Sequence, residues 1–125
     1  MFPEDLVKTG QALVDFCKAG DEAGALAALY SDDAVSVEGA AMPDGTREGV
    51  GVAAIRSKQD WWNGAHEVHA LDVSGPFFHG NDRFAVVFDM DITALETGAR
   101  SAMREVAEYT VKDGRIVKEE FFYGA

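Results

Sequence analysis

The chain has 125 residues, of which 47% are hydrophobic and 26% are charged, as is normal for a globular domain. Its net charge of −11 would repel a phosphate backbone, so we expect no nucleic-acid partner. No apolar run reaches the roughly 20 residues of a membrane-spanning helix, and residues 1–5 lack the basic flank and apolar stretch of a signal peptide. We therefore expect one cytoplasmic domain over residues 1–125, with no membrane partner.

Three helices are predicted from apolar residues at helical spacing. The first runs from about Glu4 to Lys18, and Asp21 caps a second, short helix. The third runs from about Val50 to Trp62 and ends before Gly64. The single cysteine, Cys17, excludes an internal disulfide and a multi-cysteine metal site, and its place on the first apolar stripe indicates a core residue.

The segment between the second and third helices holds one short strand and a long loop. We interpret Ser31–Asp33 as a turn, Ala34–Glu38 as the strand and residues 39–49 as the loop, because of its glycines and proline. Val35 and Val37 form the more convincing core face of the strand, which would leave Glu38 solvated at its end.

From His66 onward the apolar pattern has a period of two residues, which indicates β-strands. Four long strands follow, at about residues 66–74, 83–93, 102–111 and 115–123. Ser74–Pro76 would end the first of them, and a second part would resume at Phe77. Helices before an antiparallel meander indicate an α+β domain. We expect a cone-shaped, barrel-like fold in which three N-terminal helices pack on a curved antiparallel sheet around a cavity.

Glu105 interrupts the inward face of a strand. Met103, Ala107, Tyr109 and Val111 share its parity and are apolar or aromatic. A carboxylate that points inward either finds partners or takes up a proton, because burial of an isolated charge costs too much free energy. Glu105 is therefore a candidate site residue. The alternative is a carboxylate at the rim that pairs with an arginine or lysine.

The register of the last hairpin depends on its turn at Lys112–Gly114. We favour a three-residue loop, which places Glu105 opposite Phe121 and turns Glu119 inward. A two-residue turn would instead place Lys118 and other charged residues opposite the inner positions.

Several segments resemble the nuclear transport factor 2-like superfamily, in its SnoaL-like branch. They are Gly20–Asp21, Leu29–Ala34, Trp61–His69, Ser74–Phe77, Glu108–Val117 and Glu119–Tyr123. The resemblance covers nearly the whole chain and implies the α+β cone described above. The superfamily includes steroid isomerases, polyketide cyclases, dehydratases, epoxide hydrolases and non-enzymatic binders, so the fold alone does not identify a reaction.

The resemblance also relates single positions to those of a ketosteroid isomerase. Glu38 falls where the isomerase has its general-base aspartate. Leu13 and Ala107 fall where the isomerase has the tyrosine and protonated aspartate of its oxyanion hole. One lost oxyanion donor typically lowers the rate by a hundredfold or more. The resemblance therefore argues against steroid isomerisation.

His66 and His69 are further candidates. They are three residues apart on a strand, so they point to opposite faces and cannot chelate one metal ion. We therefore predict no metal site and no cofactor. His69 shares parity with Leu71 and Val73, which favours His69 as the inward histidine, whereas His66 could reach the cavity from the mouth of the strand.

Two functions remain open. The first is a pocket for a small, mostly apolar or amphipathic molecule. The protein would either only bind this molecule or catalyse a proton transfer on it without a cofactor, of the isomerase, dehydratase or cyclase type. Glu105 or Glu38 would be the base and His66 or Tyr109 the acid. The other candidate ligand-binding residues are Trp61, Trp62, His69, Phe88, Met90, Met103, Phe121 and Tyr123.

The second function is a non-catalytic, dimeric interaction module whose core is filled by its aromatic side chains. Under either function we expect a homodimer, because Val87 and Val106 lie on the outer face of the sheet, where a monomer would expose them. On the same face Asp89 and Asp91 are expected to pair with Arg104.

Overall fold

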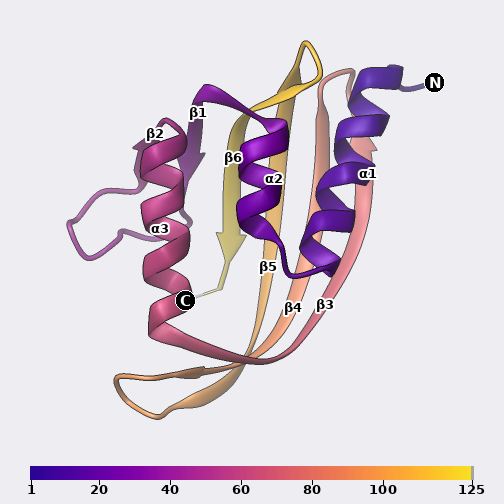
Figure 1. Cartoon of the computed structure of the whole chain (residues 1–125). Helices are drawn as coiled ribbons and strands as arrows, with labels where there is room; N and C mark the ends of the chain where they lie inside the picture. The colour runs from indigo at the N-terminus through magenta and orange to yellow at the C-terminus, as the bar shows by residue number, and fades with distance from the viewer. Residues whose placement is uncertain (125) are drawn as a thin grey trace.

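The computed structural model describes residues 1–124, in which three helices lie against one face of a curved six-stranded sheet (Figure 1). The helices are α1 (Glu4–Lys18), α2 (Glu22–Leu29) and α3 (Val52–Ala65). The strands are β1 (Tyr30–Val37), β2 (Glu48–Val50), β3 (His66–His79), β4 (Arg83–Ala94), β5 (Arg100–Lys112) and β6 (Arg115–Tyr123). The predicted α+β architecture is confirmed.

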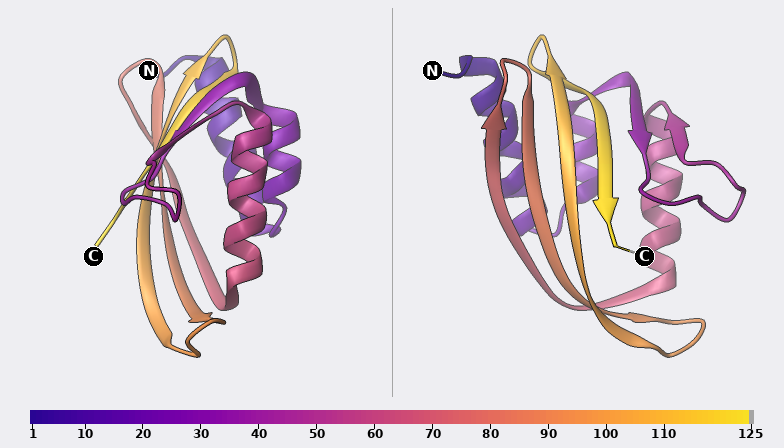
Figure 2. Two further views of the ribbon diagram at one scale, coloured as in Figure 1. Left: turned by 90° about the vertical axis from the view of Figure 1, so that its left-hand side faces the viewer. Right: turned by 180° about the vertical axis from the view of Figure 1, so that it is seen from behind.

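The strands lie in the order β2-β1-β6-β5-β4-β3, so β3 to β6 form the predicted consecutive hairpins. The β1–β6 pair is parallel and every other pair is antiparallel. The sheet is therefore mixed, where the sequence suggested an antiparallel one. Seen from the side, the sheet bends along its length and all three helices lie on its concave side (Figure 2).

Helix α1 packs on the sheet through the predicted apolar stripe. Leu6, Leu13, Val14 and Cys17 are all buried. Burial raises the pKa of the Cys17 thiol to about 12, so this cysteine is a core residue rather than a nucleophile. Gly10 lies on the same stripe, and a Cβ at that position would come within 2.8 Å of the Phe78 ring.

Strand β1 differs from the prediction in its extent and in its inner face. Ser31–Asp33 belong to the strand rather than to a turn, and they lie in a register shift between Tyr30 and Val35, which both pair with β6. Tyr30, Ala34 and Ser36 are the buried residues of β1. The prediction that Val35 and Val37 form the core face was therefore wrong, and Glu38 has the parity of the inner face.

Strand β3 runs without a break from His66 to His79, so the predicted end at Ser74–Pro76 was wrong. Register shifts between Val68 and Ala70, and between Ser74 and Phe77, absorb extra residues opposite β4. Because the first shift changes the parity of the side chains, residues before and after it cannot be assigned to faces by counting in twos.

The β5–β6 hairpin has neither of the predicted registers. Lys112 pairs with Arg115 across a two-residue turn in which Asp113 and Gly114 have φ of 52° and 75°. A register shift follows between Thr110 and Val111. Because of this shift, Glu119 pairs with Tyr109 and points inward, as predicted. Further along, Glu105 lies opposite Tyr123 rather than Phe121.

The outer face of the sheet carries ion pairs between β4 and β5. Arg104 contacts Asp89 at 2.7 Å, as predicted, whereas Asp91 pairs with Arg100 at 2.8 Å. None of the helices within residues 1–124 combines the length and apolar character needed to cross a membrane.

The close approach of α1 to β3 and β4 at Gly10 can be tested by substitution. Gly10→Val forces its branched side chain against Phe78 and Phe84, and we expect the free energy of unfolding to fall by about 2 kcal/mol. Gly64→Val makes the same change in α3 where nothing lies within 4 Å of the added Cβ, and it should be nearly neutral. Urea denaturation compares the two variants, and equal effects would contradict the packing described here.

Candidate functional site

A cavity of about 390 Å³ lies between the helices and the inner face of the sheet. All of the predicted site residues except His69 line it, namely Glu38, Trp61, Trp62, His66, Phe88, Met90, Met103, Glu105, Tyr109, Phe121 and Tyr123. The helices contribute further lining residues from the core stripe, such as Leu13. The core of the domain is therefore hollow where these aromatic side chains lie.

The two histidines lie on opposite faces of β3. His69 is exposed, and its Nε2 lies 2.7 Å from Oγ1 of Thr93 on β4. The parity argument for His69 was wrong because the register shift after Val68 intervenes. His66 lines the cavity, and its ring stacks on Trp62 with ring centres 4.3 Å apart.

The hydrogen bonding of His66 fixes which of its ring nitrogens is left as an acceptor. Its Nδ1 lies 2.9 Å from the Trp62 carbonyl oxygen. A carbonyl oxygen only accepts, so Nδ1 carries the proton in this contact and the neutral ring keeps an unprotonated Nε2. His66 can therefore accept a hydrogen bond from a ligand, or donate one after protonation.

Glu105 lies on the cavity wall without a partner. It projects from β5 between Phe88 on β4 and Tyr123 on β6, and no residue within 1–124 makes a hydrogen bond or ion pair with its carboxyl group. Burial, and next the negative charge of Glu38, raise its pKa to about 7, while the positive charge of Lys58 opposes the shift. Near pH 7 this carboxyl group can therefore both accept and donate a proton.

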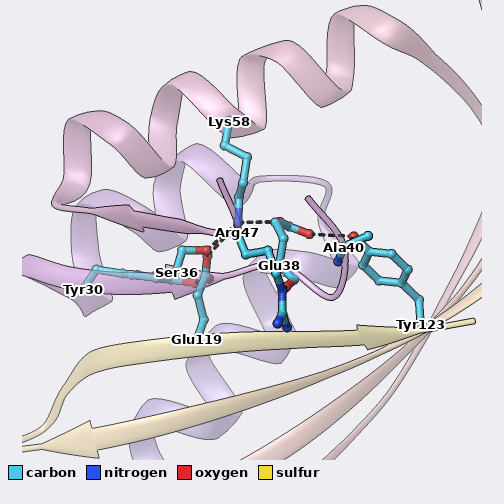
Figure 3. Close-up of polar contacts among 8 residues, drawn as sticks. All are labelled: Tyr30, Ser36, Glu38, Ala40, Arg47, Lys58, Glu119 and Tyr123. Carbon is cyan, nitrogen blue, oxygen red and sulfur yellow. Dashed lines mark hydrogen bonds and ion pairs between the residues drawn. The ribbon is translucent and has the colours of Figure 1, made fainter. Parts of the chain in front are cut away.

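Beside Glu105 lies a polar network centred on Lys58, which the sequence analysis missed (Figure 3). Lys58 reaches down from α3, and its Nζ lies 2.7 Å from Oε1 of Glu38 and 3.5 Å from Oε2 of Glu119. The same ammonium donates a hydrogen bond to Oγ of Ser36 on β1. Its three N–H groups thus have three oxygen partners.

Glu119 is the buried carboxylate of this network, with 2% of its surface exposed. It accepts hydrogen bonds from the Tyr30 hydroxyl and, at 2.6 Å, from the Ser36 hydroxyl. Burial and the neighbouring charge of Glu119 raise the pKa of Tyr30 well above its usual value, so Tyr30 stays a neutral donor. Two hydroxyl donors and one ammonium therefore stabilise the buried charge.

Glu38 connects the network to the loop after β1. The Tyr123 hydroxyl donates to Oε2 of Glu38 at 3.2 Å and accepts from the Ala40 amide at 3.2 Å (Figure 3). Arg47 donates to the carbonyl oxygen of Glu38 at 3.0 Å. The expectation that Glu38 is a solvated strand end was wrong, because it lies in an ion pair that holds this loop against the pocket.

Tyr109 contributes a hydroxyl that is accessible from the cavity. Its ring stacks on Phe84 with centres 4.8 Å apart, and only 3% of the residue is exposed. No residue within 1–124 makes a hydrogen bond to its oxygen. Burial, and next the charge of Glu119, raise its pKa well above the usual value, so it remains protonated and able to donate.

A helical-spacing signal could have identified Lys58. It lies three residues after Ile55, which is buried, and four before Trp62, which lines the cavity, so helical spacing places it on their side of α3. The alternation of Ala34, Ser36 and Glu38 was a second signal, and the prediction wrongly preferred the valines between them. In the part of the chain that the structure describes, no three His, Cys, Asp or Glu side chains form a metal-binding cluster.

Comparisons with known proteins place this geometry in a family. The family model described as the SnoaL-like domain matches residues 20–123. A protein from Mesorhizobium loti, designated a candidate SnoaL-like polyketide cyclase, is 40% identical over 94% of this chain and 97% of that chain, with a TM-score of 0.85. No curated protein matches the chain.

Two further solved structures share the fold. A Delta 5-3-ketosteroid isomerase from Mycobacterium sp. is 25% identical over 96% of this chain and 93% of that one, with a TM-score of 0.68. A candidate isomerase from Bacillus subtilis, 18% identical over 97% and 87% with a TM-score of 0.73, shows the fold alone. Because the family model matches most of its length, the chain belongs to the SnoaL-like domain family, in the nuclear transport factor 2-like superfamily that its sequence resembles.

Proposed function

We propose that the cavity binds a small, mostly apolar molecule and that Glu105 exchanges a proton with it. The single observation that carries this proposal is the position of the Glu105 carboxyl group, on the wall of a cavity of about 390 Å³ and without a partner among residues 1–124. Glu38 and Glu119, by contrast, have Lys58 and hydroxyl groups as partners. Glu22 also lines the cavity, but it is exposed at the start of α2. Glu105 is thus the carboxyl group on the inner face of the sheet that is left for a ligand.

A structural role does not account for Glu105. An isosteric neutral side chain would avoid the free energy that is needed to bury the charge and to hold it near other carboxylates. Because the folded state raises its pKa, the ionised form of Glu105 lowers stability near neutral pH. Residues that lower stability and face a cavity are typical of binding and catalytic sites.

The chemistry that fits this group is proton transfer without a cofactor. Glu105 as a carboxylate would take a proton from carbon next to a carbonyl group, and the electron pair would move to the carbonyl oxygen. Protonated His66, which lines the same cavity, would donate a hydrogen bond to that oxygen. Return of the proton to another carbon gives isomerisation, loss of a neighbouring hydroxyl group as water gives dehydration, and attack of the carbanion on a second carbonyl gives cyclisation.

Steroid isomerisation is not proposed. Leu13 and Ala107, which correspond to the oxyanion-hole residues of the isomerase, are buried apolar side chains and cannot donate hydrogen bonds. The candidate polyketide cyclase from Mesorhizobium loti is the more similar protein and supports chemistry on a carbonyl compound.

The alternative, a dimeric module without chemistry, predicts a filled interior with Glu105 in an ion pair. The cavity and the unpartnered carboxyl group favour the binding site instead. The single domain, the homodimer, the absence of a nucleic-acid partner or cofactor and the cytoplasmic location stay predictions.

Glu105→Gln tests the site directly. The variant keeps the shape of the side chain but cannot exchange a proton, so we expect turnover, or the binding of ligands found by a thermal-shift screen, to fall at least tenfold. Glu108→Gln makes the same change three residues along β5, on the outer face, and should leave both unchanged. Unaltered binding and turnover in Glu105→Gln would show that the assignment is wrong.

Because the pKa of Glu105 is raised in the folded state, this residue makes the stability of the protein depend on pH. With a pKa of about 7 in the folded state against an ordinary value of 4.5, wild-type stability falls as the pH rises from about 4.5 through 7, and Glu105→Gln lacks this fall. Glu105 is half-buried, so we expect the stability of the variant relative to wild type to rise by about 2 kcal/mol between about pH 5 and pH 8. Urea denaturation across this range measures the difference, and a constant difference would contradict the shift.

Lys58→Met tests whether the network holds the pocket together. It leaves Glu38 and Glu119 without their shared cation, and we expect the free energy of unfolding to fall by about 3 kcal/mol. Lys8→Met removes the exposed pair with Glu4 at 3.7 Å and should change stability by less than about 0.5 kcal/mol. Similar effects of the two variants would contradict the role of Lys58.

A further inference from the structure

We propose that the ligand of this pocket is a cation, an apolar molecule with one amine or other positively charged nitrogen that pairs with the Glu105 carboxylate. This ligand class deepens the proposed function, on which it rests, because it concerns the same cavity.

The charges that line the cavity do not balance. The carboxylates are Glu22, Glu38, Glu105 and Glu119, whereas the lining groups that can be positive are Lys58 and His66. Arg47 is exposed, is not part of the lining and reaches only the carbonyl oxygen of Glu38. A ligand that enters the pocket therefore meets an excess of negative charge, which favours a cation and opposes an anion.

Lys58 cannot receive an anionic ligand in this arrangement. Its ammonium donates to Ser36 and contacts Glu38 and Glu119, so its three N–H groups are already directed at oxygen atoms of the chain. A ligand carboxylate or phosphate would have to break one of these contacts and leave a chain carboxylate unpaired, which is unfavourable in a buried site. An ammonium ligand disturbs none of them.

Tyr109 provides a second, independent sign that the cavity takes a polar ligand. The residue is 97% buried, its hydroxyl lines the cavity, and no group within residues 1–124 bonds to it. Glu105 lies four residues away on the same face of β5, which is roughly 13 Å along the strand. A ligand that reaches both is elongated, with its cationic nitrogen at Glu105 and a second polar atom at Tyr109.

The aromatic walls suit the apolar body and the charge of such a ligand. Trp61 and Phe88 line the cavity beside the carboxylates. The pocket already holds one cation against a ring, because Nζ of Lys58 lies 4.5 Å from the centre of the Phe121 ring. A ligand ammonium gains the same attraction from the faces of the other rings.

Binding of a cation is coupled to the proton of Glu105. The groups that face Glu105 are Glu38 after β1, Lys58 on α3, Glu119 and Tyr123 on β6, Glu22 on α2, His66 on β3 and Tyr109 on β5. Without ligand, burial and the neighbouring carboxylates hold the pKa of Glu105 at about 7. A bound cation favours the ionised form, so a proton leaves to solvent when binding takes place below that pH.

The experiment uses the full chain and three probes that share a naphthalene ring: naphthylmethylammonium, naphthylmethanol and naphthoate. In calorimetric titrations at about pH 8, the ammonium probe should bind at least tenfold more tightly than the alcohol, and naphthoate should not bind measurably. Glu105→Gln should weaken binding of the ammonium probe about tenfold and leave the alcohol within about twofold. Glu4→Gln, which removes an exposed carboxylate outside the cavity lining, should change neither.

Proton release provides a second measurement that needs no variant. At about pH 6, titrations of wild type in buffers of different ionisation enthalpy should show release of close to one proton per ammonium ion bound. Equal affinity for the alcohol and the ammonium probe, tightest binding of naphthoate, or binding without proton release would overturn the cationic ligand while leaving the apolar pocket in place. Binding of none of the three probes would overturn the pocket as well.

Discussion

The ammonium of Lys58 is the contact on which the architecture of the pocket depends. It joins α3 to the inner face of the sheet through Ser36 on β1 and Glu119 on β6, and to the following loop through Glu38. These elements are far apart in the chain, and each would carry an uncompensated polar group without the others. Because the three oxygen partners use all three N–H groups, the helix has one position over the sheet, and that position leaves the cavity open beside Glu105.

The same contact bears on the raised pKa of Glu105. One ammonium serves both Glu38 and Glu119, so the pocket holds more negative than positive charge before Glu105 is counted. A further ionised carboxylate is therefore disfavoured both by burial and by its neighbours, and the carboxyl group titrates near neutral pH. Glu38 and Glu119 have partners within residues 1–124, whereas Glu105 faces the cavity without one.

Sequence patterns were reliable where a strand or helix stays regular and unreliable at irregularities. The stripe of α1 and the alternation that turns Phe84, Val86 and Ile92 inward are found as predicted, because burial of one face fixes the register. The register shift after Val68 moved His69 to the outer face, and the shift at Thr110 changed the partners of Glu105. A bulge inserts one residue without a distinctive side chain, so counting in twos fails beyond it.

The sequence by itself determined the α+β class, the resemblance to the family and the inward position of Glu105, since these follow from periodicities and local segments that each lie within one element. Only the tertiary structure decided which side chains share the pocket. Whether Lys58 meets Glu119 depends on how α3 lies across the sheet and on the parallel β1–β6 pair, which brings Ser36 beside Glu119. Both are contacts between distant segments, and their geometry is set by packing of the whole core rather than by any local preference.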